Sequence, residues 1–389
     1  MLRFLTAGES HGPELLAILE GIPSGLALDE ADLVPDLARR QKGFGVGPRM
    51  KSIEKDEASI VSGVLAGATI GAPIGLRILN RDHAKWKGQS VPPMSIPRPG
   101  HADLTAALKY GYSDLRFSLE RASARETAAR VAIGAVCRKL LAEFGIVVGS
   151  YVVEIGKASA EIDEMDFEDR FKAAEESEVR SPTDAGTQAM RDEIGSAMQA
   201  KDTLGGVFEV IALHVPPGLG SHVHWDRRLG ARVAAAMMSI HAMKGVEIGQ
   251  GFQNARLRGT QVHDEFATSD GRIQRTSNSA GGLEGGITTG DPLIVRVAMK
   301  PISTTLTPRA SVDLATGEPA ETNYERSDFC SVPRAAIVGE AMLCFVLAEA
   351  MLEKLGGDTL SEMTERFDQL PLGQLDDFAL TNEPINFWD

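Results

Sequence analysis

Apolar residues recur at alternate positions in several short stretches of the chain, a pattern typical of β-strands with one buried face. The predicted strands are residues 2–7, 15–20, 59–65, 74–80, 146–156, 205–215 and 291–299. Neighbouring strands often follow one another after a short turn that contains Gly or Pro. Because a short turn joins antiparallel strands, we expect largely antiparallel sheets.

Longer Ala-rich segments alternate with these strands and predict helices at about residues 118–143, 225–244 and 335–355. The stretch 157–201 is charged and mostly acidic, so we expect solvated helix and loop at the periphery with little chemistry. Residues from about 360–389 are expected to form a loose tail. Together these elements predict a layered α+β fold. No repeat, linker or break in composition divides the chain, which predicts one domain over residues 1–389.

The composition restricts the class of partner. The net charge is −14 and aromatic residues make up only 5%, so the chain lacks the basic, base-stacking character of a nucleic-acid-binding protein. An acidic protein can still bind a small anion where its Arg and Lys residues are concentrated in one cleft. We therefore expect a small-molecule ligand and no nucleic-acid partner.

The compartment is predicted from what the sequence lacks. Cys137, Cys330 and Cys344 are widely spaced and support neither a disulfide frame nor a zinc site. No stretch approaches the roughly 18 uninterrupted apolar residues that a membrane span needs. A polar motif begins by residue 8, which leaves no room for a signal peptide. We expect a cytoplasmic protein with no membrane partner.

Two turns each carry a histidine. GESHG (8–12) contains His11, and RPGHAD (98–103) contains His101. Glycines let the backbone turn tightly, so either ring can be presented to a cleft. A surface turn with a hydrogen-bonded His explains the first motif equally well. Asp103 could orient the His101 ring or cap the following helix, and we expect the cap.

Basic residues are concentrated in two places. A loop interleaved with GFGVGP carries Arg39, Arg40, Lys42, Arg49 and Lys51, and no acidic residue occurs from 37 to 53. A basic loop is usually a solvated surface, but the missing counter-charges favour anion binding by arginine. Further on, Arg121 and Arg125 share a helix face near its N-terminal end, where the helix dipole attracts anions. Arg130 lies on another face and is expected to pair with Glu126.

The remaining motifs are weaker. GGLEGGITTG (281–290) is a flexible loop or a backbone that comes close to a flat or phosphorylated ligand, and KPIST (300–304) follows it. Arg326 beside Asp328 is ordinarily a structural ion pair. His222 and His224 have no third ligand nearby, so we expect no metal site.

Taken together, the motifs resemble the chorismate synthase family. The segments that carry the resemblance are GESHGPELLAILEGIP (8–23), RPGHAD (98–103), ERASARETAARVAIGA (120–135), MMSIHAMKGVEIGQGF (237–252), SNSAGGLEGGITTG (277–290), KPIST (300–304) and RSDFCSVP (326–333). The resemblance implies a β-α-β sandwich, with a helical layer between two mainly antiparallel sheets, assembled as a homotetramer.

The resemblance also implies the reaction. Such an enzyme removes phosphate and a proton from 5-enolpyruvylshikimate 3-phosphate by 1,4-elimination, giving chorismate, the last common step of the shikimate pathway to aromatic amino acids. It requires reduced FMN without net redox change. The reduced flavin comes from a flavin reductase or another source, and some members use NADPH themselves.

Site residues follow from the same resemblance. The catalytic set it implies is His11, His101, Asp328, Ser10 and Ser123. The substrate clamp comprises Arg39, Arg40, Arg49, Arg98, Arg125 and Arg326. The FMN-binding set is Arg121, Ala122, Ser123, His241, Ala242, Gly286, Lys300, Pro301, Ile302, Ser303, Thr304 and Arg326.

Val46 stands where many relatives have Arg. This departure motivates an alternative, an inactive relative that binds flavin or an anionic metabolite without turnover. A phosphatase or kinase-like enzyme is a weaker alternative, because the sequence contains no Walker loop, metal triad or nucleophile elbow.

Overall fold

The computed structural model describes residues 1–47, 53–162, 165–325, 327–381 and 383–384. Its two larger sheets are antiparallel throughout. The first has the order β1 (Arg3–Ala7), β2 (Glu14–Glu20), β6 (Ile74–Leu79) and β3 (Ala58–Ser62). The second has the order β10 (Met243–Ile248), β15 (Leu293–Met299), β9 (Gly206–Leu213), β7 (Val147–Ile155) and β8 (Ala158–Ser159).

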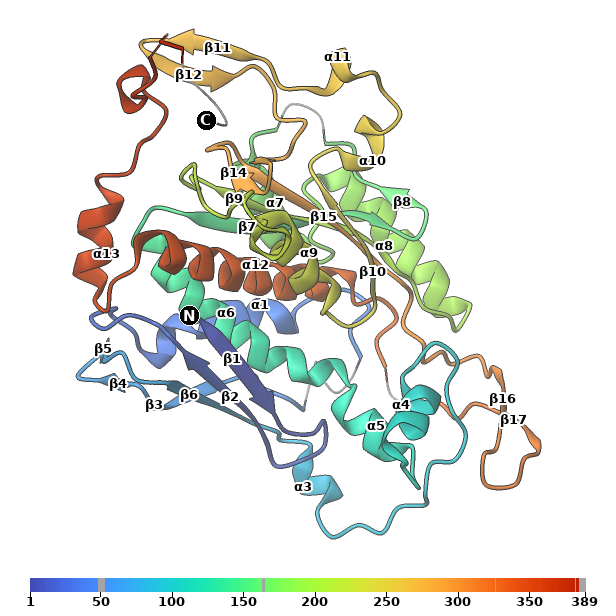
Figure 1. The fold of residues 1–389 in the computed structure, drawn as a ribbon. Helices are drawn as coiled ribbons and strands as arrows, with labels where there is room; N and C mark the ends of the chain where they lie inside the picture. The colour runs from blue at the N-terminus through green and yellow to red at the C-terminus, as the bar shows by residue number, and fades with distance from the viewer. Residues whose placement is uncertain (48–52, 163–164, 326, 382, 385–389) are drawn as a thin grey trace.

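Two long helices pack together between these sheets (Figure 1). Helix α6 (Thr127–Ala142) contacts β2 and β6, and α12 (Val332–Leu355) contacts β7 and β9. They approach closely because Gly134 faces Ala341, and a side chain at position 134 would overlap it. The mixed helix-and-sheet class and the antiparallel pairing are as predicted.

The first sheet shows why alternation predicted its strands. In β2, Leu15, Ala17 and Leu19 are buried against the helices. Leu16 and Ile18 lie on the opposite face and are exposed. Successive side chains of a strand point to opposite faces, so a single buried face gives this period of two.

The acidic stretch 157–201 is more than a solvated surface. It forms α7 (Phe167–Glu176) and α8 (Asp184–Gln199), which cover the outer face of the second sheet (Figure 1). Ala174, Met190 and Ile194 are buried there. Strands β7 and β9 are therefore buried on both faces. The segment forms helices at the periphery, but their inner face is packed against the sheet rather than solvated.

The first part of the segment predicted as a loose tail is packed, whereas the described residues 371–381, 383 and 384 are almost all exposed. Helix α13 (Leu360–Phe367) buries Met363, and Leu360 N–H donates to the Ser24 carbonyl at 2.9 Å. Further on, Gln374 pairs with Arg272 of the hairpin β11 (Phe266–Ser269)–β12 (Arg272–Arg275).

Two predicted helices are shorter than expected. The segment 118–143 is divided into α5 (Arg116–Arg121), a 3-10 turn (Ala124–Glu126) and α6. The break comes at Ser123, whose backbone is extended and whose hydroxyl accepts from Arg125 N–H. The segment 225–244 contains only a 3-10 turn (Trp225–Arg227) and α9 (Leu229–Met238), because the chain turns at Ala242 (φ 68°) into β10.

Helix α12 is long and apolar enough to cross a membrane by length and composition alone. However, 83% of its most apolar window is buried inside the protein, as in the core helix of a globular fold. The other described elements are α1 (Val34–Gln41), β4 (Val64–Leu65), β5 (Ala68–Thr69), α3 (His83–Trp86), α4 (Asp103–Tyr110), α10 (Gly251–Asn254), α11 (Gly259–Val262), β13 (Leu283–Glu284), β14 (Ile287–Thr288), β16 (Ala310–Val312) and β17 (Pro319–Glu321), with 3-10 turns at Glu30–Asp32 and Leu375–Asp377.

Candidate active site

A cavity of about 440 Å³ lies where the turn after β1, the break between α5 and α6, and the loops after α9 and β15 meet. Pockets of about 300–1,000 Å³ hold most small ligands. The described residues of its wall include five basic side chains and two carboxylates, namely Arg40, Arg98, Arg125, Lys300 and Arg334 with Glu325 and Asp328. His11, His101 and His241 also line it, so the two histidine turns of the sequence share one cavity.

The GESHG turn reaches the cavity because Gly8 has φ 108° and leaves no space for a side chain. Ser10 N–H then donates to the Glu120 carbonyl at 3.0 Å. His11 N–H donates to Glu120 Oε2 at 2.7 Å, and His11 Nδ1 lies 2.7 Å from Oε1 of the same carboxylate. The Trp86 ring packs on the imidazole with centroids 4.3 Å apart. The His11 ring is thus held in one orientation.

His101 is held in a similar way. Its Nδ1 lies 2.6 Å from Asp103 Oδ1, and Arg98 Nε donates to Asp103 Oδ2 at 2.8 Å. Burial opposes the charge of Asp103, but hydrogen bonds from His101 and Arg98 hold its pKa well below the usual range. The predicted helix cap is wrong, because Ala102 occupies the N-cap position and Asp103 orients the ring.

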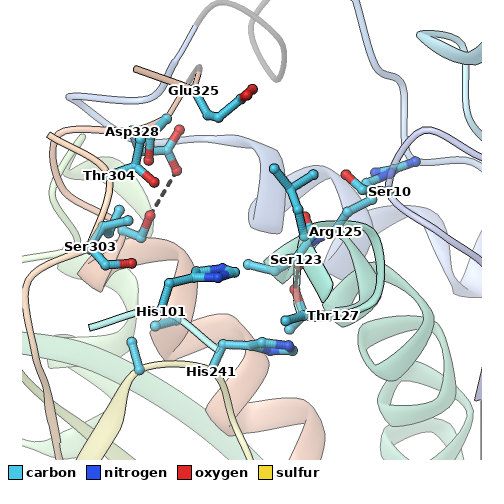
Figure 2. Close-up of a pocket in the computed structure, with 18 of the residues that line it drawn as sticks. Ser10, His101, Ser123, Arg125, Thr127, His241, Ser303, Thr304, Glu325 and Asp328 are labelled. Carbon is cyan, nitrogen blue, oxygen red and sulfur yellow. Dashed lines mark hydrogen bonds between the residues drawn. The ribbon is translucent and has the colours of Figure 1, made fainter. Parts of the chain in front are cut away.

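Arg98 is occupied by protein groups. Besides Asp103, its Nη1 donates to Thr304 Oγ1 at 3.2 Å, and the side chain is buried. Arg98 was predicted to bind the substrate; it lines the cavity, and its contacts join the His101 turn to the loop after β15. Figure 2 shows Thr304 and Ser303 on one side of the His101 ring and Ser123 on the other.

A second group of arginines lies at the start of α6. Arg40 Nη1 donates to Asp56 at 2.7 Å and its Nε to Thr127 at 3.1 Å. Burial lowers the pKa of Arg40 to about 10, against the opposing attraction of Asp56, so it is charged at neutral pH. Arg125 donates to Asn80 at 2.8 Å and pairs with Asp56.

The third guanidinium nitrogen of Arg125 is paired less closely than the other two. Its Nη2 is buried and has no hydrogen-bond partner among the described residues, although Glu54 lies 3.6 Å away. Nη2 thus forms an ion pair with Glu54 but no hydrogen bond to it. Because Arg125 also lines the cavity, its positive charge would attract an anionic ligand there.

Asp328 is tied to the basic loop. It accepts from Gly47 N–H and from Ser331 Oγ, each at 2.8 Å, and pairs with Arg334. Asp328, Ser10 and Ser123 all line the cavity (Figure 2). All five residues predicted to be catalytic therefore line the same cavity.

Most of the predicted cofactor set lies on the cavity as well. Its lining includes Ala122, Ser123, His241, Ala242, Lys300, Ile302, Ser303 and Thr304. Arg121 lines an adjoining depression that shares His241, and Pro301 is exposed beside the cavity. Gly286 is not brought to the cavity, because it lies between β13 and β14 against Arg228. Arg49 and Arg326 lie outside the described residues.

Arg39 is also not brought to the cavity. It donates to Glu340 and Asp36 at 2.8 Å and pairs with Glu175 on the far side of α1. Adjacent helical residues point about 100° apart, so Arg39 and Arg40 cannot share one face. Val46 is buried at 7% exposure and does not line the cavity.

Sequence reasoning missed several groups that complete the site. Arg334 lines the cavity and donates to the Arg40 carbonyl at 3.1 Å. Glu120, Asp56 and Asn80 orient the cavity residues His11, Arg40 and Arg125. Glu120 and Arg334 stand within or beside the quoted motifs, but nothing in the spacing indicated which distant side chain each would contact.

The cavity can accept a flat, anionic cofactor. His241 Nδ1 is buried without a hydrogen-bond partner among the described residues, and burial lowers the pKa of this imidazole, so it is neutral at pH 7. Ile240, Ala242 and Ile302 supply apolar wall beside Lys300. Apolar walls with a few polar groups are typical of cofactor sites. The described residues hold no group of three His, Cys, Asp or Glu that could bind a metal ion.

The comparisons with known proteins agree with one another. The model of the family described as chorismate synthase matches residues 2–352. The chain is 54% identical over 387 residues to the chorismate synthase of Aquifex aeolicus, covering 94% of this chain and 96% of that one. It is 51% identical over 380 residues to the chorismate synthase of Saccharopolyspora erythraea, covering 93% and 94%. A crystal structure of chorismate synthase superposes with a TM-score of 0.78 at 47% identity, covering 95% of this chain and 96% of that chain.

Proposed function

The chain belongs to the chorismate synthase family, and on that premise we propose that this cavity binds 5-enolpyruvylshikimate 3-phosphate together with reduced FMN. Membership makes the protein a phosphate-eliminating lyase of the shikimate pathway. The observation that carries the proposal is the cavity itself, where five basic side chains and the two turn-borne histidines meet.

The charge of the substrate explains the inventory of the wall. Two carboxylates and one phosphate give it a charge between about −3 and −4, since the second phosphate pKa is near 6. Bringing such an anion out of water requires several cations that are already in position. Arg40, Arg125 and Arg334 would contact the substrate, and Arg98 would support the wall through Asp103 and Thr304.

The cofactor would lie along Ala122, Ser123, His241, Ala242 and the 300–304 loop, with Arg121 at its margin. Reduced FMN bound along these residues would supply electron density to the substrate. The neutral His241 would offer one nitrogen to a polar atom of the bound group. The apolar residues near it would exclude water from the reacting face.

The histidines and Asp328 would handle protons. His11, with Nδ1 occupied by Glu120, would deliver a proton from Nε2 to the departing phosphate. His101, with Nδ1 on Asp103, would exchange a proton through Nε2 on the cofactor side. Asp328, Ser10 and Ser123 would help to carry away the proton lost from the substrate ring.

The assembly and the surroundings belong to the same proposal. We propose a cytoplasmic homotetramer that receives reduced FMN from a flavin reductase or another source and binds neither nucleic acid nor membrane. The net charge of −14 supports the absence of a nucleic-acid partner. Leu5, Leu16, Ile18 and Leu79 are exposed on the outer face of the first sheet, which supports association. The helices α6 and α12 between the two sheets support the layered sandwich of the family.

The test is an anaerobic assay with purified protein. Chorismate and phosphate should form with reduced FMN and not with oxidised FMN alone. His11→Ala and His101→Ala should each lower kcat by roughly two to four decades if they transfer protons. Wild-type rates in both variants would reject the catalytic assignment. Tight binding of flavin or substrate with no turnover would instead favour the inactive relative.

A further inference from the structure

The geometry assigns Glu120 as the positioning residue of His11: we propose that its carboxylate keeps a proton on Nδ1, so that all proton exchange with the substrate occurs at Nε2. The inference rests on the proposed role of His11 in the phosphate elimination. It names a residue on α5, 109 positions from His11 in sequence, that controls which nitrogen reacts.

The first argument comes from the two contacts of the carboxylate. Glu120 Oε2 accepts the backbone N–H of His11 at 2.7 Å. A backbone N–H can only donate, so this contact fixes which way the carboxylate faces. Oε1 is then directed at His11 Nδ1, also at 2.7 Å. A carboxylate oxygen is only an acceptor, so Nδ1 carries the hydrogen in both protonation states of the ring.

The second argument comes from the other sides of the ring. Trp86 covers one face, and the His11 side chain is only 15% exposed. His83 Nδ1 lies 2.9 Å from the His11 carbonyl and secures the same turn. Because Glu120 holds Nδ1, exchange of a proton with a ligand in the cavity would use the other ring nitrogen, Nε2.

Other charged groups near the ring are few among the described residues. Asp82 Oδ2 lies 4.0 Å from Nε2 and is fully buried, and Arg116 lies on the Trp86 ring, 5.8 Å from its centroid. Glu120, on α5, is a charged residue that contacts the His11 ring directly. Replacing it should therefore change the protonation of His11 without removing the imidazole.

The decisive variant is Glu120→Gln. Its amide oxygen must still accept the His11 backbone N–H, so the NH₂ group faces Nδ1 and opposes a proton there. Exchange of the imidazole C2 hydrogen, followed residue by residue by mass spectrometry on the full chain, reports the protonation of each His. We expect the midpoint pH at His11 to fall by about one unit. We expect kcat to fall about ten- to a hundredfold with KM within about threefold.

The matched control is Glu365→Gln, an exposed carboxylate on α13, which should leave the midpoint and kcat unchanged. If Glu120→Gln does not fold, Glu120→Asp provides the test. It keeps the charge but draws it back by one methylene, so the midpoint should fall less, in the same direction. An unchanged His11 midpoint in a folded variant would overturn the inference. Full activity of His11→Ala would instead overturn the proposed role of His11. The two failures can be told apart, because the midpoint at His11 is measured without turnover.

Discussion

Arg39 and Arg40 are neighbours at the end of α1, and they serve two different clusters. Arg39 belongs to a cluster around Glu340, with Arg138, Arg180, Asp36 and Glu175. Arg40 belongs to the cavity wall with Arg125 and Arg334. Both clusters are rich in arginine, although Arg39 and Arg40 themselves belong to one basic loop in the sequence.

The difference lies in where the carboxylates stand. Around Glu340, three arginines face three carboxylates, and Ser150 donates to Glu340 as well. Positive and negative side chains are therefore equal in number in this cluster, although Arg180 Nε has no hydrogen-bond partner among the described residues.

At the cavity, Asp56 and Asp103 contact Arg40 and Arg98 but do not line the cavity. Asp328 and Glu325 do line it, and Asp328 pairs with Arg334. Five basic side chains therefore face two carboxylates at the wall, which leaves a net positive charge for an anion.

Stability should change most when Glu340, the shared partner of the Arg39 cluster, is replaced. Glu340→Gln leaves three arginines without their shared buried partner, so the free energy of unfolding should fall by about 3–5 kcal/mol. Urea denaturation at pH 7 measures it, with the exposed Glu168→Gln as control. A loss below about 1 kcal/mol would mean that the cluster contributes little to stability.

A slightly smaller effect is expected on activity, where substitutions of Arg40 and Arg39 should give different results. Arg40→Met should lower kcat/KM by about a hundred- to a thousandfold, because the cavity loses a positive charge that is already in position. Arg39→Met should keep kcat/KM, per folded molecule, within about threefold, and should lose stability instead. Steady-state kinetics with reduced FMN and urea curves on both variants provide the comparison. Equal losses of kcat/KM would show that both arginines serve the substrate.

A smaller difference is expected in how the unfolding free energy depends on pH. Burial opposes the charge of Glu340, but Arg39, Arg138 and Arg180 lower its pKa from 4.5 to about 2. A lowered folded pKa stabilises the protein above the unfolded value, and that stability is lost as pH falls from about 4.5 through about 2. The unfolding free energy of the wild type should therefore fall more steeply than that of Glu340→Gln between pH 5 and pH 3, by up to about 2 kcal/mol. Parallel curves would contradict this.

Much of the fold could be predicted because burial on one face leaves a local record. The strands β1, β6, β7, β9 and β15 fall within predicted segments, and β2 begins one residue earlier than predicted. Strand β10 was missed because its sequence, MKGVEI, has no clear alternation and follows a helix without a strong stop signal. The break at Ser123 was missed because its cap interrupts an otherwise continuous Ala-rich pattern.

The site divides in the same way. The resemblance of the motifs to a known family predicted that two turn-borne histidines, an arginine-rich helix start and the 300–304 segment serve one function, since motif residues are a local property of the sequence. Only the tertiary structure decided that Arg40 faces the cavity while Arg39 does not, that Asp103 orients His101, and that Glu120 meets His11 from 109 residues away. Such contacts depend on which helix faces pack together, and packing joins residues whose separation along the chain carries no record of the contact.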